Sequence, residues 1–217
     1  MIVLADNDLI SKLAKCDLLK SLPDILQVSI EDIFIAPAAR YQLLPKKSEK
    51  ALAKYGNQET VERVRGFLDS VKDIQEVSDD ELLIRLASVP KIDPGEQLLF
   101  ASCMTNKNAL LLTGDRNALN ALAESKELSD VHQSLAGRVV TFESALLVAS
   151  KILGFDAVKE KLLAYPGKKD GVLNLIVRED MVESNFEECL VSYSRSVVHF
   201  LASRELLPLS LFLEQAA

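Results

Sequence analysis

The chain has 217 residues, of which 48% are hydrophobic, so it can bury a core as one large domain or as one domain with an appendage. It is acidic, with 32 aspartates and glutamates against 25 lysines and arginines, and this balance argues against a broad phosphate-binding surface. No apolar run approaches the roughly 18 to 20 residues of a membrane span, and three scattered cysteines without Cys-x-x-Cys spacing fit a reducing cytoplasm.

Four short apolar and β-branched runs in the first two thirds of the chain predict buried strands. They cover residues 2–5, 34–36, 110–113 and 138–142, and an acid or a proline follows each run closely. Longer segments with apolar residues at helical spacing lie between them. This alternation predicts an α/β fold of three layers, in which a short parallel sheet is covered by helices on both faces.

After residue 142 the strand pattern fades, and helices are predicted over 144–153, 157–164 and 187–206. Gly154 is a typical C-terminal stop for the first of these helices. We therefore divide the chain into a domain of residues 1–145 and a helical extension of residues 146–217. The extension could cover an edge of the sheet, form a homodimer or bind an antitoxin-like partner, and a packed helical appendage is the simplest interpretation.

Three acids are placed where the predicted strands and helices meet. Asp6 follows the first strand, Asp115 follows the strand at 110–113, and Glu96 begins the helix that leads into that strand. Because the carboxyl ends of parallel strands share one edge of a sheet, these carboxylates are expected to converge there. Converging carboxylates repel one another, and oxygen ligands suit Mg²⁺ or Mn²⁺ rather than zinc.

Each of these acids also has a purely structural explanation. Residues 93–96 (DPGE) resemble a capping box, with Asp93 as the N-cap and Glu96 as its partner at the third helical position. Asp6 and Asp115 could each cap the helix that follows. For one acid alone the cap is the better explanation, whereas three acids on one edge favour a shared site.

Two segments resemble the PIN-domain family, namely 6–13 (DNDLISKL) and 93–101 (DPGEQLLFA) followed by 111–116 (LLTGDR). The resemblance covers roughly residues 1–145. It implies a metal-dependent nuclease that acts on RNA, with Asp6, Glu96 and Asp115 as metal ligands. It also implies that Thr113 supports the site from behind. A bound ion would activate a water for attack on a phosphodiester.

The chain departs from the family on the helix after the second strand, where PIN nucleases typically carry a further glutamate. Residues 36–43 (APAARYQL) contain no acid, and Arg40 lies near the expected position. Asp8 or Asp93 could substitute as a ligand, and Asn117 could assist as a neutral one. Two hypotheses follow: a Mg²⁺- or Mn²⁺-dependent endoribonuclease acting on single-stranded RNA, or a lapsed PIN-like domain that serves as a binding or regulatory module.

Basic residues near the acids are candidates for contacts with substrate phosphates, namely Lys12, Arg40 and Arg116. A lysine stripe at helical spacing could serve the same purpose, although a solvated helix face explains it better; it comprises Lys46, Lys47, Lys50 and Lys54. Tyr41 is one candidate for base stacking. No glycine-rich phosphate loop and no nucleophile elbow is found in the sequence.

Overall fold

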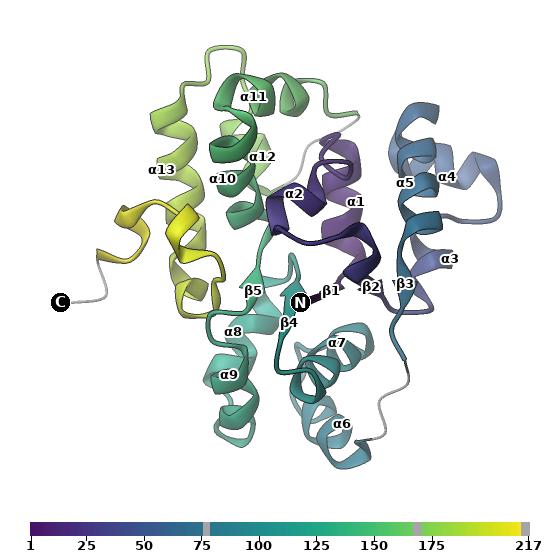
Figure 1. Ribbon diagram of the computed structural model, residues 1–217, viewed down its shortest axis with the longest axis vertical. Coiled ribbons are helices and arrows are strands. Elements are labelled where there is room, and N and C mark those ends of the chain that lie inside the picture. Colours follow the sequence, from purple (N-terminus) through teal and green to yellow (C-terminus); the bar gives the residue numbers. More distant parts are fainter. Residues whose placement is uncertain (76–78, 167–170, 214–217) are drawn as a thin grey trace.

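The computed structural model describes residues 1–75, 79–166 and 171–213. Its centre is a five-stranded sheet with the order β3-β2-β1-β4-β5, in which every pair of neighbours is parallel (Figure 1). The strands are β1 (Ile2–Ala5), β2 (Ile33–Ile35), β3 (Lys72–Asp73), β4 (Ala109–Leu112) and β5 (Val139–Val140). The predicted α/β fold with a short parallel sheet is confirmed.

The central strands β1 and β4 are apolar on both faces, because helices cover the sheet on both sides. All four residues of β4 are buried, as are three of the four in β1. The strand predicted at 138–142 is shorter than expected, since Thr141 caps the next helix with its hydroxyl and that helix begins at Phe142. Strand β3 was not predicted, because its two residues are charged and exposed; its backbone pairs with β2, and Lys72 Nζ lies 5.8 Å from the centroid of the Phe34 ring on β2.

Helices cover the two faces of the sheet in separate groups (Figure 1). The group over one face surrounds α1 and contains α1 (Asn7–Lys15), α2 (Leu22–Leu26), α3 (Ala39–Leu43), α4 (Ser48–Tyr55), α5 (Gln58–Ser70) and α10 (Phe142–Leu153). The group over the other face surrounds α7 and contains α6 (Asp80–Ala87), α7 (Pro94–Thr105), α8 (Arg116–Glu124) and α9 (Ser129–Leu135). The result is the expected arrangement of three layers.

The strand order reverses direction at β1. From β1 the chain moves outward to β2 and β3, and it then returns to place β4 on the other side of β1. The carboxyl ends of β1 and β4 are therefore the topological switch point, which is where open α/β sheets usually bind their ligands. The backbone N–H of Asp6 donates to the carbonyl of Leu112 at 2.8 Å and joins the two strand ends.

The C-terminal part contains α11 (Phe155–Leu163), α12 (Gly171–Ile176) and α13 (Glu183–Ser194) after α10. The boundary expected near residue 145 falls inside α10, and Gly154 ends that helix at φ 90°, as predicted. The helix predicted over 187–206 is wrong beyond Ser194. There the chain turns into a 3-10 segment, Arg195–Phe200, and Leu201 then forms a parallel bridge with Val139. Because β5 would otherwise expose unpaired backbone groups, this segment covers the edge of the sheet.

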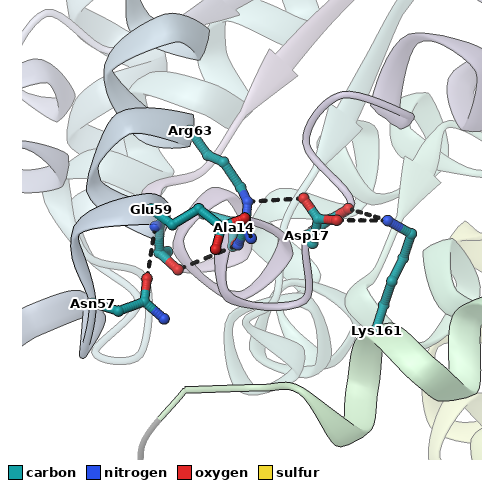
Figure 2. Close-up of polar contacts among 7 residues, drawn as sticks. Ala14, Asp17, Asn57, Glu59, Arg63 and Lys161 are labelled. Atoms are coloured by element: carbon teal, nitrogen blue, oxygen red, sulfur yellow. Dashed lines mark hydrogen bonds and ion pairs between the residues drawn. The ribbon is translucent and has the colours of Figure 1, made fainter.

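Asp17 fastens the C-terminal helices to the first helix group (Figure 2). Its Oδ1 lies 2.8 Å from Nε of Arg63 on α5, and its Oδ2 lies 2.6 Å from Nζ of Lys161 on α11. Arg63 also donates to the carbonyl of Ala14 at 3.2 Å. Asp17 itself adopts a left-handed backbone conformation with φ 54°. One carboxylate therefore joins three helices and is neutralised by two cations.

Buried apolar side chains form a continuous core from the N-terminal strand to the C-terminal segment. Its largest fully buried members include Tyr55, Phe100, Phe186 and Phe200. Among the residues that the structure describes, no helix is both long enough and apolar enough to span a membrane.

Candidate active site

Asp6 lies at the junction between β1 and α1. Its backbone is extended, with φ −80° and ψ 148°, and its Oδ2 accepts a hydrogen bond from the backbone N–H of Asp8 at 3.3 Å. Asp6 is therefore the N-cap of α1, as the structural explanation predicted. The strand supplies its position and the cap supplies its orientation.

Asp115 occupies the corresponding position between β4 and α8. Its Oδ1 accepts from the backbone N–H groups of Asn117 at 2.7 Å and Ala118 at 3.0 Å, so it caps α8. Thr113 is buried beneath this turn, and its hydroxyl oxygen accepts from the backbone N–H of Asp115 at 3.2 Å. This contact puts Thr113 where it can hold the aspartate in place.

Glu96 begins α7 in a complete capping box. Asp93 Oδ1 accepts from the backbone N–H of Glu96 at 2.8 Å, and Glu96 Oε2 accepts from the backbone N–H of Asp93 at 2.8 Å. Pro94 stands at the first helical position, as the sequence predicted. Glu96 is only 5% exposed, which is unusual for an acidic residue that forms no ion pair among the described residues.

The three acids are brought within electrostatic range of one another. Burial, together with the carboxylates of Asp115, Asp93 and Asp6, raises the pKa of Glu96 to about 8, against the opposing effect of the hydrogen bond from the N–H of Asp93. Burial also raises the pKa of Asp6 to about 6, assisted by Asp8 and by Asp93. The structure therefore collects acidic residues at the switch point, including Asp93, which the sequence predicted as a helix cap and as a possible substitute ligand.

We call this cluster the acidic edge; it comprises Asp6, Asp8, Asp93, Glu96 and Asp115. None of the ion pairs found among the described residues involves any of the five. In Asp6, Glu96 and Asp115 the cap occupies one carboxylate oxygen. The second carboxylate oxygen of Glu96 and of Asp115 accepts no hydrogen bond from the part of the chain that is described.

The acidic edge has the donor chemistry of a Mg²⁺ or Mn²⁺ site, because all its side-chain donors are carboxylate oxygens. The carboxylates lie farther apart in this structure than the ligands of one bound ion would. Within residues 1–75, 79–166 and 171–213, no group of three or more histidines, cysteines, aspartates or glutamates lies close enough together to hold one ion. The caps explain the spacing, since each carboxylate is turned toward the start of its own helix.

Two of the predicted phosphate contacts hold the fold together. Arg40 donates to the carbonyls of Leu68 at 2.6 Å and Val71 at 2.9 Å, and its Nε lies 2.6 Å from Asp73 Oδ1. It therefore fixes β3 and the end of α5 beside α3.

Arg116 lies beside Asp115 but is directed toward the C-terminal part. It donates to the carbonyl of Tyr193 at 2.7 Å, and its guanidinium lies 4.7 Å from the centroid of the Tyr193 ring. The contact attaches the end of α13 to the start of α8. As contacts for substrate, both Arg40 and Arg116 remain predictions.

A polar concavity of about 410 Å³ adjoins Asp115. Its lining comprises Asp8, Lys12, Gly114, Asp115, Arg116, Asn117, Asn120 and Ser196. Asn120 follows Asn117 by three residues on α8, so helical spacing alone could have indicated it. Ser196 comes from the 3-10 segment after α13, and the predicted long helix concealed its position.

Comparison with protein-family models, with curated proteins and with solved structures finds no match to this chain. The parallel sheet and its order describe the fold without assigning a family.

Proposed function

We propose that the chain is a PIN-like endoribonuclease that uses Mg²⁺ or Mn²⁺ held by Asp6, Glu96 and Asp115. The observation that carries this proposal is the acidic edge at the switch point of the sheet. Its acids come from two strand ends and one helix start, and none of them forms an ion pair among the described residues. Burial, assisted by the neighbouring acids, raises the pKa of Glu96 to about 8. Strongly perturbed carboxylates in such a position are typical of functional sites.

A divalent cation would relieve the repulsion that now favours protonated carboxyls. When bound, it would supply an activated water and stabilise charge on the leaving oxygen. The chain's own residues would set the geometry of the site: Thr113 holds the backbone of Asp115, and the N–H of Asp93 orients Glu96. Asn117 stands beside Asp115 as a neutral polar group.

RNA is proposed as the substrate because segments 6–13, 93–101 and 111–116 resemble the PIN-domain pattern. The polar concavity beside Asp115 supports the same choice, since a nucleotide needs hydrogen-bonding partners next to the reacting phosphate. The concavity also borders the C-terminal segment through Ser196, which gives that segment a place next to the substrate.

The test is cleavage of a mixed pool of single-stranded RNA with Mn²⁺, comparing wild type with Asp115→Asn. Asparagine keeps the oxygen that caps α8 but removes the charge. The matched control is Asp79→Asn, because Asp79 caps α6 in the same way, accepting from the N–H of Leu82 at 3.0 Å away from the acidic edge. We expect the Asp115 variant to lose on the order of 100-fold or more in rate, and the Asp79 variant to cleave normally. Equal cleavage by all three proteins would refute the proposal.

A second function is favoured by a specific observation at Arg40. This residue stands near the position where the family carries a further acid, and its contacts with Leu68, Val71 and Asp73 are structural. A lapsed PIN-like domain that acts as a binding or regulatory module would use this arrangement without an ion. It predicts no cleavage and no thermal stabilisation by Mn²⁺, because an ion bound only by the folded state must raise stability.

A further inference from the structure

Three half-buried lysines lie on or beside α1: Lys12 and Lys15 belong to this helix, and Lys54 belongs to α4. Lys12 and Lys15 follow Asp8 along this helix at intervals of four and three residues, so the three side chains lie on one face. The face begins at the acidic edge with Asp8 and ends in the last turn of the helix with Lys15. By the rise of an α-helix, it is roughly 10 Å long.

Lys54 on α4 joins this face from the side. Its Nζ donates to the carbonyl of Gln42 at 2.8 Å, and the neighbouring Tyr55 is buried and donates to the carbonyl of Leu43 at 2.8 Å. These two contacts fix α4 against the end of α3. Gln42 also accepts a hydrogen bond on its side-chain oxygen from Asn7 at the start of α1, so Lys54 lies beside this helix. In agreement with this position, Asp8 raises the pKa of Lys54 and Lys15 lowers it, while burial has the largest effect and lowers it.

These lysines lie over aromatic rings and form no ion pair with any described carboxylate. The distances from Nζ to a ring centroid are 5.8 Å for Lys12 over Phe142, 5.6 Å for Lys15 over Tyr165, and 5.6 Å for Lys54 over Tyr55. The chain has an excess of acids, and Lys161, for comparison, is paired with Asp17. Three adjacent lysines without such partners remain available to a negatively charged ligand.

We propose that Lys12, Lys15 and Lys54 form a phosphate track that guides single-stranded RNA along α1 into the acidic edge. This inference rests on the proposed function for its choice of ligand. Carboxylates repel a polyanion, so a strand that reaches them needs cations directly beside them. The track ends at Asp8, next to Asp6, and supplies these cations in a protein whose overall charge is −7. Lysine contacts bind the backbone in any sequence, while the concavity beside Asp115 is left for the nucleotide itself.

Each lysine also has a local structural role, and an experiment must distinguish this role from phosphate binding. Lys12 and Lys15 stand in the last turn of α1, where positive charge stabilises a helix, and Lys54 binds the end of α3. Glutamine removes the charge and keeps a hydrogen-bond donor, whereas arginine keeps the charge. If the lysines bind phosphates, glutamine variants should lose affinity for RNA and arginine variants should keep it.

The experiment measures binding of a fluorescent twelve-nucleotide oligouridylate by anisotropy, in EDTA and over a range of NaCl concentrations. It compares wild type with the triple variant Lys12→Gln, Lys15→Gln and Lys54→Gln. The matched control removes the same charge elsewhere, by Lys20→Gln, Lys107→Gln and Lys126→Gln, because these lysines are exposed and unpaired among the described residues. The slope of log affinity against log salt changes by about 0.7 for each phosphate contact on a single strand, so the track variant should lose about 2.

The track is supported if its glutamine variant loses at least tenfold in affinity at low salt, the control does not, and the arginine triple variant restores binding. Equal binding by the two glutamine variants, or no binding by wild type, would overturn it. Equal competition by polyglutamate of the same charge would also overturn it, because the face would then serve acidic polypeptides. Binding is measured without metal, so this result is independent of the cleavage assay. If only the phosphate track is wrong, Mn²⁺-dependent cleavage is still observed; if only the nuclease proposal is wrong, the protein binds the RNA without cleaving it.

Discussion

Asp17 and the acidic edge are two regions of the molecule that treat carboxylates in opposite ways. Asp17 meets Arg63 and Lys161 on its two oxygens at 2.8 Å and 2.6 Å. At the acidic edge the described hydrogen bonds to Asp6, Glu96 and Asp115 come from backbone N–H groups, and the acids repel one another. The same chain therefore neutralises a carboxylate where it joins helices, whereas at the switch point several carboxylates form no ion pair among the described residues.

The carboxylate of Asp17 therefore stabilises the fold, whereas the repulsion among the acids of the acidic edge destabilises it. The Asp17 contacts join α5, α11 and the end of α1, so their removal weakens packing (Figure 2). The acids of the edge do cap their helices, but an asparagine or a glutamine could cap them without repulsion. Carboxylates that lower the stability of the fold are most simply explained by a ligand that binds to them.

The largest effect is expected from Asp17→Ala, which should lower the free energy of unfolding by about 3 kcal/mol. It leaves Arg63, whose side chain is 15% exposed, with Glu59 as its remaining ion-pair partner, and it leaves Lys161 with no ion pair among the described residues. It also places alanine at φ 54°, a left-handed backbone conformation that is costly for this residue. Urea unfolding measures the change, with Asp180→Ala as the control for an exposed aspartate in a turn. A loss below about 0.5 kcal/mol would show that the two ion pairs are ordinary surface pairs.

A smaller effect of opposite sign is expected from Glu96→Gln in the absence of metal. The pKa of Glu96 is raised from 4.5 to about 8 in the folded state, so the folded protein binds more protons than the unfolded chain between these values. The contribution of Glu96 to the free energy of unfolding should therefore be fully present below pH 4.5, and it should be lost as the pH rises through this window. Glutamine cannot ionise, and it can still accept the hydrogen bond from the N–H of Asp93.

The Glu96 variant should therefore be more stable than wild type by on the order of 2 kcal/mol at pH 8 and about equal to it at pH 4. Thermal unfolding in EDTA across this pH range measures the difference. Glu81→Gln, an exposed first-turn residue of α6, is the control and should show no such trend. A difference that does not depend on pH would contradict the electrostatic account of the acidic edge.

The sequence predicts those parts of the fold that depend on local pattern. Strands β1 and β4 follow from short apolar runs, and the capping box at Asp93 follows from residue identities at fixed spacing. The approach of Asp6 to Glu96 and Asp115 follows from the rule that parallel strands end on one edge. The raised pKa values of Asp6 and Glu96 could not be predicted from the sequence, because their largest cause is burial.

The parts that the sequence did not predict depend on backbone pairing or on the direction of a side chain. Strand β3 has no apolar signal, and the 3-10 segment after Ser194 continues a helical spacing while its backbone pairs with β5. Arg40 and Arg116 were predicted from charge alone. Their donors are directed to backbone carbonyls, which no residue type reveals in advance.

Calorimetric titration with Mn²⁺ at pH 7.5 tests most directly whether the acidic edge is a cation site. The experiment uses wild type, Asp115→Asn and the cap control Asp79→Asn, in two buffers with different ionisation enthalpies. The account predicts binding by wild type and by the Asp79 variant, with release of protons because Glu96 is largely protonated at this pH, and loss of binding in the Asp115 variant. Identical heats in all three proteins, or no binding by wild type, would contradict it.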